Sequence, residues 1–182
     1  MTDMTVKAFT VWLTGLSGAG KSTIARAFGA HLDNLSLRNQ VLDGDELRRT
    51  LCRDLGFSKE DRDENIRRIA GLASELNKNN VIAVVAVISP YRAARLMARQ
   101  QCERFVEVFV DCSLETLTRR DTKGLYRRAL AGEIQNFSGI SDPYEAPQDP
   151  EIYINSAIQS EQESLERVRS RLEELGYLLA AR

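Results

Sequence analysis

The stretch Gly15-Leu16-Ser17-Gly18-Ala19-Gly20-Lys21-Ser22 matches the pattern G-x-x-x-x-G-K-[ST] at every position. The residues before it, Phe9 to Thr14, are mostly β-branched or aromatic and predict a strand. The residues after it, Thr23 to Leu32, carry apolar side chains at a helical spacing. A strand-to-helix turn that binds nothing is the alternative, but the agreement of all three segments favours a phosphate-binding loop.

This loop predicts the chemistry of one ligand. Its glycines let successive backbone N–H groups converge on an anion, and the helix that follows points its positive end at the same place. Lys21 would reach the β- and γ-phosphates, and the Ser22 hydroxyl would ligate Mg²⁺. We therefore predict a nucleoside triphosphate bound with Mg²⁺ by Gly15, Leu16, Ser17, Gly18, Ala19, Gly20, Lys21, Ser22 and Thr23.

Bulk composition restricts the remaining possibilities. The 182 residues suit one domain, and 43% hydrophobic with 28% charged residues is ordinary for a globular protein. A net charge of -1 gives no reason to expect a nucleic-acid or membrane partner. Three widely spaced cysteines fit neither a disulfide framework nor a zinc site, and no signal-peptide pattern is present, so we expect a cytoplasmic protein.

Strand and helix patterns alternate along the chain. Strands are expected at 9–14, 40–43, 81–88, 105–110 and 152–154, and helices at 21–37, 46–52, 59–79, 91–101, 114–120, 125–131 and 161–175. The alternation predicts an α/β fold, a three-layer sandwich of the P-loop NTPase type with a central parallel sheet. No domain boundary is evident, so residues 1–182 would form one domain, and the irregular segment 132–150, with three of the four prolines, would be either a functional loop or a disordered one.

Two carboxylates follow the expected strand at 40–43. Asp43 and Asp45 flank Gly44 at the edge of the sheet where ligands bind. Such carboxylates hold Mg²⁺ or accept the proton of an attacking hydroxyl. An Asp-Gly turn with Asp45 capping the next helix explains the same residues, and the sequence does not choose between the two.

The long expected helix at 59–79 carries polar groups on its inward face. Arg62 and Asn65 continue the apolar stripe toward the N-terminal end, next to Phe57 and across from Arg48. Inward polar groups need partners, and an anionic substrate would supply them because a guanidinium fork matches phosphate or sulfate. Surface pairing of Arg62 with Asp61 or Glu64 is the alternative.

Two residues flank the irregular segment in ways that suggest ligand contact. Lys123 would add positive charge near the phosphate loop, and Phe137 would stack on a base. A solvated lysine and a loop-anchoring phenylalanine are the ordinary interpretations of the same residues.

Several separated motifs resemble one family. They are, in chain order, WLTGLSGAGKST, LDGDELR, LGFS-x-x-DR-x-ENIRR, ISPYR, F-x-EVFVD, RD-x-KGLYRRA-x-x-GEI and F-x-GI-x-DPYE-x-P. Together they are similar to adenylylsulfate kinase (APS kinase) from about Phe9 to Ile152. The resemblance implies transfer of the γ-phosphoryl of ATP to the 3′-hydroxyl of adenosine 5′-phosphosulfate (APS), which gives 3′-phosphoadenylyl sulfate (PAPS) and ADP. It also implies that residues 1–182 form a single P-loop kinase domain with segment 132–150 as a mobile lid, and that the protein is a homodimer.

The same resemblance implies roles for individual residues. Lys21, Asp43, Asp45 and Lys123 would be catalytic, with Ser22 and Asp43 on magnesium and Arg120 against the ATP adenine. Phe57 and Phe137 would sandwich the substrate adenine. The remaining contacts to the acceptor nucleotide would come from Asp45, Arg48, Arg62, Asn65, Ser89, Lys123 and Leu125.

Ser89 corresponds to a serine that has been described in the family as phosphorylated. Direct in-line transfer between two bound nucleotides needs only positioning and charge stabilisation, so we expect no covalent intermediate. Ser89, which precedes Pro90, would instead form a hydrogen bond to substrate or backbone.

Two other functions share the phosphate loop. A kinase for another small metabolite would have no need of Phe57 and Phe137 together with Arg48 and Arg62. A GTPase-type switch usually carries N-K-x-D after a strand, whereas Asn77-Lys78-Asn79-Asn80 lacks the acid and precedes its strand.

Overall fold

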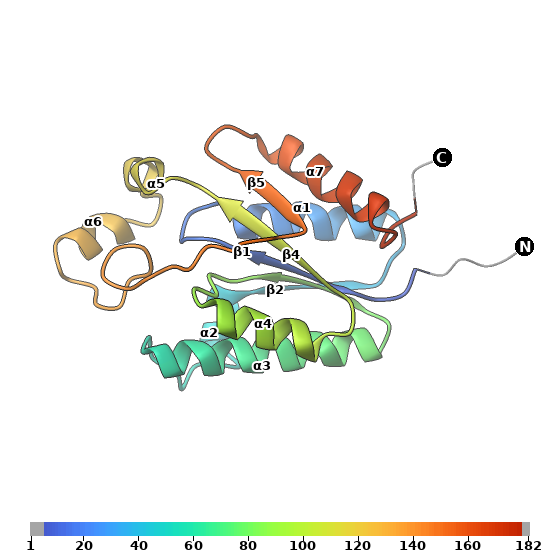
Figure 1. Cartoon of the computed structure of the whole chain (residues 1–182), viewed down its shortest axis with the longest axis horizontal. Coiled ribbons are helices and arrows are strands. Elements are labelled where there is room, and N and C mark those ends of the chain that lie inside the picture. Colours follow the sequence, from blue (N-terminus) through green and yellow to red (C-terminus); the bar gives the residue numbers. More distant parts are fainter. Residues whose placement is uncertain (1–5, 180–182) are drawn as a thin grey trace, which may run out of the picture.

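The computed structural model describes residues 6–179 and contains one five-stranded parallel sheet with the order β2-β3-β1-β4-β5 (Figure 1). The predicted domain also included residues 1–5 and 180–182, which lie outside the described residues. The central strand β1 pairs in parallel with β3 and β4, so that Leu13 lies opposite both Ala86 and Val108. The strands are β1 (Thr10–Thr14), β2 (Asn39–Asp43), β3 (Ile82–Ala86), β4 (Phe105–Asp111) and β5 (Ile152–Asn155).

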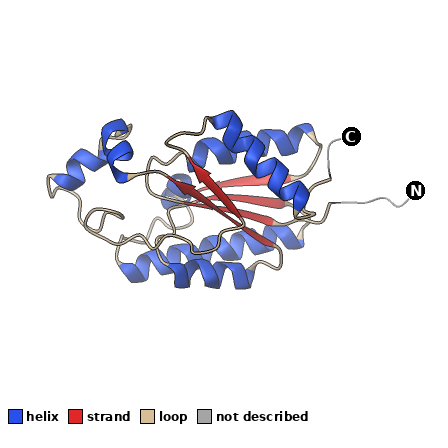
Figure 2. Cartoon of the chain, turned by 45° about the horizontal axis from the view of Figure 1, so that its top comes forward, coloured by secondary structure: helices blue, strands red, loops and turns tan. Residues whose placement is uncertain are grey.

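Helices cover both faces of the sheet, which confirms the predicted three-layer α/β fold (Figure 2). One layer holds α1 (Lys21–Asn34) and α7 (Glu161–Glu174), and the other holds α3 (Lys59–Lys78) and α4 (Arg92–Gln101). The short helix α2 (Gly44–Arg49) follows β2 directly. Helices α5 (Leu114–Arg120) and α6 (Leu125–Leu130) lie beyond the carboxyl end of β4, at the left of Figure 1.

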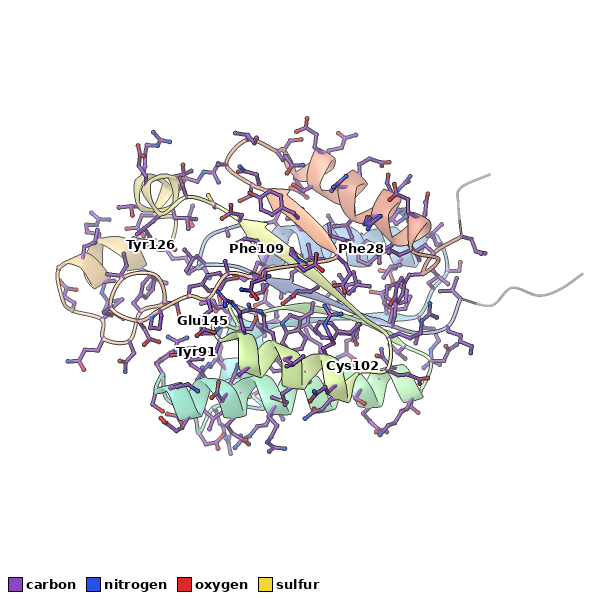
Figure 3. All side chains as sticks on the ribbon, in the orientation of Figure 1. Phe28, Tyr91, Cys102, Phe109, Tyr126 and Glu145 are labelled. Carbon is purple, nitrogen blue, oxygen red and sulfur yellow. The ribbon has the colours of Figure 1, made fainter. Side chains whose placement is uncertain are left out.

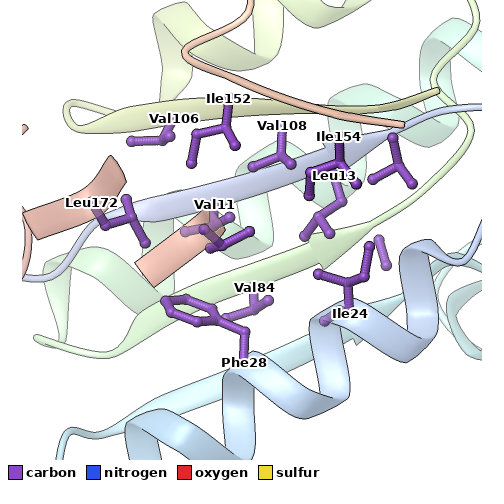
Figure 4. Packing of buried hydrophobic residues seen from close by; sticks show 14 of the residues in the cluster. Val11, Leu13, Ile24, Phe28, Val84, Val106, Val108, Ile152, Ile154 and Leu172 are labelled. Atoms are coloured by element: carbon purple, nitrogen blue, oxygen red, sulfur yellow. The ribbon is translucent and has the colours of Figure 1, made fainter. Parts of the chain in front are cut away.

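Strands β1 and β3, in the middle of the sheet, are buried along their whole length, because side chains pack against them on both faces. On the first face, Phe28 of α1 and Leu172 of α7 pack against Val11, Val84 and Val108 (Figure 4). On the second face, Trp12 and Val85 pack against α3 and α4, which contribute Ile66, Ile69, Ala73, Ala94 and Ala98. This burial holds the carboxyl ends of the strands rigidly in place.

Several element ends differ from the predictions. The first helix ends at Asn34 rather than 37, because Ser36 takes a left-handed conformation with φ 57°. The second helix spans 44–49 rather than 46–52, because Asp43 supplies its N-cap. Strand β3 stops at Ala86 rather than 88, and residues 87–90 leave the sheet to line the site described below. Within residues 6–179, no helix is both long and apolar enough to cross a bilayer.

Candidate active site

A cleft of about 780 Å³ opens at the carboxyl ends of β1, β2 and β3. Its walls come from the phosphate loop, from the residues after β2 and β3, from the start of α3 and from the turn at 122–123. Among the predicted site residues, the cleft is lined by Ser17, Gly18, Gly20, Lys21, Ser22, Thr23, Asp43, Asp45, Arg48, Phe57, Arg62, Asn65, Ser89 and Lys123. Folding thus brings residues from five separate segments to one place.

The phosphate loop has the conformation that anion binding requires. Gly18 and Gly20 have φ of 77° and 96°, values that side-chain-bearing residues rarely adopt. Helix α1 begins directly after Gly20, so its free N–H groups point into the cleft. The Lys21 side chain, 8% exposed, folds over the loop and donates from Nζ to the carbonyl oxygens of Gly15 and Leu16 at 2.8 Å.

The electrostatics at Lys21 favour an anion. The pKa of Lys21 is lowered to about 7, chiefly by burial and in addition by the nearby charge of Lys123, and the carboxylates of Asp45 and Asp43 partly oppose these effects. A polyphosphate bound beside Nζ would restore the charged form, because an adjacent negative charge stabilises the ammonium group.

The two carboxylates after β2 have different surroundings. Asp43 caps α2 by accepting a hydrogen bond from the backbone N–H of Asp45 at 2.9 Å, so the helix cap is Asp43 and not Asp45. Asp45 pairs with Lys123, 78 residues away, and this hydrogen bond lowers the pKa of the Asp45 carboxyl. Lys123 lines the cleft, as predicted, although its side chain is 52% exposed and so is also partly solvated.

Arg62 is buried on the inward face of α3, as predicted. Its Nε donates to the Phe57 carbonyl at 3.1 Å, its Nη2 donates to the Asn136 carbonyl, and it pairs with Asp142 at 3.5 Å. The alternative of surface pairing with Asp61 or Glu64 is wrong. Glu64 is occupied by two other arginines of the same helix, Arg67 and Arg68.

A second arginine and an aromatic ring complete this wall of the cleft. The Arg48 guanidinium lies 4.7 Å from the centre of the Phe57 ring, and that of Arg62 lies 5.5 Å from it. Burial lowers the pKa of both arginines, and for Arg48 the charge of Arg62 adds to this effect. Phe57 is 57% exposed, so a flat apolar face flanked by two cations remains open to a ligand.

Asn65 lies one helical turn from Arg62 and also lines the cleft. It is 7% exposed, and its Oδ1 atom finds no hydrogen-bond partner among the described residues. A buried carbonyl oxygen without a donor is costly unless a ligand supplies one. Asn65 is therefore placed to accept a hydrogen bond from a bound molecule.

The Ser89 side chain forms hydrogen bonds to strand β1 of the sheet. Its Oγ accepts a hydrogen bond from Trp12 Nε1 at 3.1 Å and donates to Thr14 Oγ1 at 2.9 Å. The residue is 2% exposed and has a left-handed backbone with φ 42°. We predicted a bond to substrate or backbone, but both partners are side chains of β1.

The segment predicted as a lid has two unlike halves. Residues 142–146 are fixed to α4: Arg95 donates to the Glu145 carbonyl at 2.7 Å, and Tyr91 donates to Asp142 Oδ2 at 2.9 Å (Figure 3). Tyr144 shares a hydrogen bond of 3.0 Å with Thr14. Residues 132–141 are held by other contacts: the Asn136 carbonyl accepts a hydrogen bond from Arg62, and Phe137 and Ile140 pack against the core.

Six predicted contact residues lie outside the lining of the large cleft: Gly15, Leu16 and Ala19 of the phosphate loop, and Arg120, Leu125 and Phe137. Phe137 packs edge-on against Tyr126, and Arg120 donates to the Ser156 carbonyl at 3.2 Å. Arg120 and Leu125 line a much smaller recess behind Ser17 and Gly18. Tyr126, Arg95 and Tyr91 were not among the predicted site residues, although Tyr91 and Tyr126 lie within the motifs ISPYR and KGLYRRA.

Comparison with known proteins agrees with this geometry. Residues 7–155 match the family model for adenylylsulphate kinase. An adenylyl-sulfate kinase of Picosynechococcus is 52% identical over 172 residues, which cover 94% of this chain and 97% of that protein. A probable bifunctional SAT/APS kinase of Sorangium cellulosum is also 52% identical, over 95% of this chain, but the chain spans only 30% of that longer protein.

A solved structure extends the comparison to three dimensions. An APS kinase of Mycobacterium tuberculosis, in complex with AMPPNP and APS, superposes with a TM-score of 0.88 at 41% identity. The match covers 93% of this chain and 99% of that one.

Proposed function

The chain belongs to the adenylylsulphate kinase family and phosphorylates APS, and we propose that the cleft at the carboxyl ends of the strands holds both nucleotides of this reaction. The reaction moves the γ-phosphoryl group of ATP to the 3′-hydroxyl of APS and yields PAPS and ADP. It is a step of sulfate assimilation.

ATP is proposed to bind along the phosphate loop. The N–H groups of Gly15 to Thr23 would surround the phosphates, with Lys21 at the β- and γ-phosphates and Arg120 against the adenine. The Ser22 hydroxyl and the Asp43 carboxylate both line the cleft and are the oxygen ligands that Mg²⁺ prefers. Magnesium bound there would neutralise charge on the transferred phosphoryl group.

APS is proposed to occupy the wall formed by α2 and α3. Arg48 and Arg62 would bind its phosphosulfate group, with the adenine stacked on Phe57 and enclosed by Phe137 and Leu125. The unpartnered Oδ1 of Asn65 would accept a hydrogen bond from the nucleoside. Arg62 would then exchange its present partners, the Asn136 carbonyl and Asp142, for the anion.

The transfer step needs little covalent chemistry from the protein. The 3′-oxygen of APS forms a bond to the γ-phosphorus as the bond to the β,γ-bridging oxygen breaks, and ADP leaves. Asp45 would orient the 3′-hydroxyl and take its proton. Lys21 and Lys123 would stabilise the charge that develops on the equatorial and leaving oxygens.

One observation carries the proposal: an exposed phenylalanine between two inward arginines lies in the same cleft as the phosphate loop. A kinase for a sugar acid or another small acceptor would gain nothing from this arrangement. A cation-flanked aromatic face fits an acceptor that combines an adenine with a strong anion.

An ADP-release assay over several acceptors tests the function. We expect turnover with APS, none with gluconate or shikimate, and a product whose new phosphate is on the 3′-oxygen by phosphorus NMR. Turnover with another acceptor and none with APS would contradict the proposal. ADP release at an equal rate without any acceptor would favour the switch-type alternative instead.

A prediction for Ser89 follows from its hydrogen bonds. Ser89→Ala should form PAPS at an undiminished rate in a stopped single turnover, because the Oγ atom already bonds to Thr14 and Trp12. The variant should be less stable by about 1–3 kcal/mol, because the buried Trp12 N–H loses its acceptor. Loss of single-turnover product in folded Ser89→Ala would instead support a phosphoserine intermediate.

The assembly and the compartment stay predictions. A homodimer is expected from the family resemblance, and sedimentation velocity on the purified chain would test it. A cytoplasmic location is likewise the expectation from composition.

A further inference from the structure

Tyr126 joins the phosphate loop to the segment that carries Phe137. It lies in the first turn of α6, at the left of Figure 3, and is 3% exposed. Its hydroxyl donates to the carbonyl oxygen of Ser17, inside the phosphate loop, at 2.7 Å. The edge of its ring meets the Phe137 ring with the centroids 5.1 Å apart and the planes at 83°.

The two ends of this connection are the two proposed nucleotide sites. Ser17 belongs to the loop assigned to the ATP phosphates. Phe137 is assigned to the APS adenine, and the residue before it, Asn136, accepts the hydrogen bond from Arg62. A second contact joins the same two segments, because the backbone of Gly139 packs closely against the Leu16 side chain of the phosphate loop. A Cβ atom added to Gly139 would lie only 2.9 Å from Leu16 Cδ2.

The fold of α6 does not depend on the Tyr126 hydroxyl. The start of this helix is capped by the Asp121 carboxylate, which accepts hydrogen bonds from the backbone N–H groups of Tyr126 and Arg127. The hydrogen bond of the Tyr126 Oη atom is therefore not needed to form the helix. It fixes the position of the Ser17 carbonyl relative to the ring that contacts Phe137.

We propose that Tyr126 is a positioning residue that couples the two nucleotide sites: when ATP fixes the phosphate loop, Tyr126 orders Phe137 for the adenine of APS. This rests on the proposed function. A coupling of this kind is reciprocal, so APS must tighten ATP binding by the same factor. The established range of such couplings leads us to expect a factor of about 5 to 20.

Calorimetric titration of APS, with and without a non-hydrolysable ATP analogue, tests the coupling. In the wild type the analogue should tighten APS binding about 5- to 20-fold. In Tyr126→Phe the ratio of the Kd for APS without the analogue to the Kd with it should fall to below about 2. The Kd for APS without the analogue should stay within about 2-fold of the wild type, because the ring that contacts Phe137 is retained. Tyr126→Leu, which also removes the ring edge, should weaken APS binding in both conditions.

Tyr153→Phe is the matched control. It also loses a tyrosine hydroxyl with a 2.8 Å hydrogen bond, but its partner, Asp111, is outside the cleft lining. This variant should keep the wild-type ratio. A wild-type ratio near 1, or an unchanged ratio in Tyr126→Phe, would overturn the role of Tyr126 even if the wild type phosphorylates APS. Failure of the wild type to bind APS at all would overturn the proposed function itself.

Discussion

Replacing Lys21 with methionine is expected to lower kcat by about 100- to 1,000-fold. Methionine keeps most of the buried aliphatic volume but removes the ammonium group that, in the proposed mechanism, faces the transferred phosphoryl. Losing one such transition-state donor typically costs about 3–4 kcal/mol. The ADP-release assay at saturating ATP and APS measures the effect, and Lys21→Ala should show a loss of at least similar size.

Lys78→Met is the control for this substitution. Lys78 is the last residue of the long helix α3, whereas the cleft residues of this helix lie near its start. The Lys78 side chain is 71% exposed. It should leave kcat unchanged. Near-normal turnover in Lys21→Met would remove the assignment of the phosphate loop as the site of transfer.

Arg62→Ala is expected to raise the KM for APS by about 10- to 100-fold and to change the KM for ATP by less than about 2-fold. A hydrogen bond to a charged group contributes about 1.5–3 kcal/mol, and each 1.4 kcal/mol corresponds to about tenfold in affinity. Arg62 lies on the wall of the cleft formed by α2 and α3, to which we assign APS. The phosphate loop would bind ATP through its own backbone N–H donors. Initial rates at varied APS and ATP separate the two constants.

The matched control is Arg67→Ala on the same helix. Arg67 is exposed and pairs only with Glu64 of α3 among the described residues, so neither KM should change. Arg62→Ala should remain folded, because Asp142 keeps its hydrogen bond from Tyr91, and a thermal melt checks this point. Equal increases in both KM values would contradict the assignment of Arg62 to the acceptor.

The sequence predicted the features that depend on local patterns. The phosphate loop could be found because glycine spacing, a preceding strand and a following helix are all encoded within about 25 residues. The inward face of α3 could be found because Arg62 and Asn65 share the period of Ile69 and Ala73, and all four are buried. Asp43 and Asp45 could be placed at the sheet edge because parallel strands end together.

Contacts between distant segments were not predictable in this way. Asp45 meets Lys123 and Arg62 meets Asp142 only because the chain returns to the same edge of the sheet about 80 residues later. The division of segment 132–150 depends on Arg95, whose partners lie on three other segments. Ser89, which has a left-handed backbone, is held by hydrogen bonds of its hydroxyl group to Trp12 and Thr14 of β1. Local periodicity carries no signal for such pairs.

A crystal structure with a non-hydrolysable ATP analogue and APS bound together tests the account most directly. We expect the triphosphate on the N–H groups of Gly15 to Thr23 and the phosphosulfate on Arg48 and Arg62. The APS adenine should lie on Phe57, and its 3′-hydroxyl should point at the γ-phosphate in line with the β,γ-bridging oxygen. Either nucleotide bound outside this cleft, or a 3′-hydroxyl directed away from the γ-phosphate, would contradict the account.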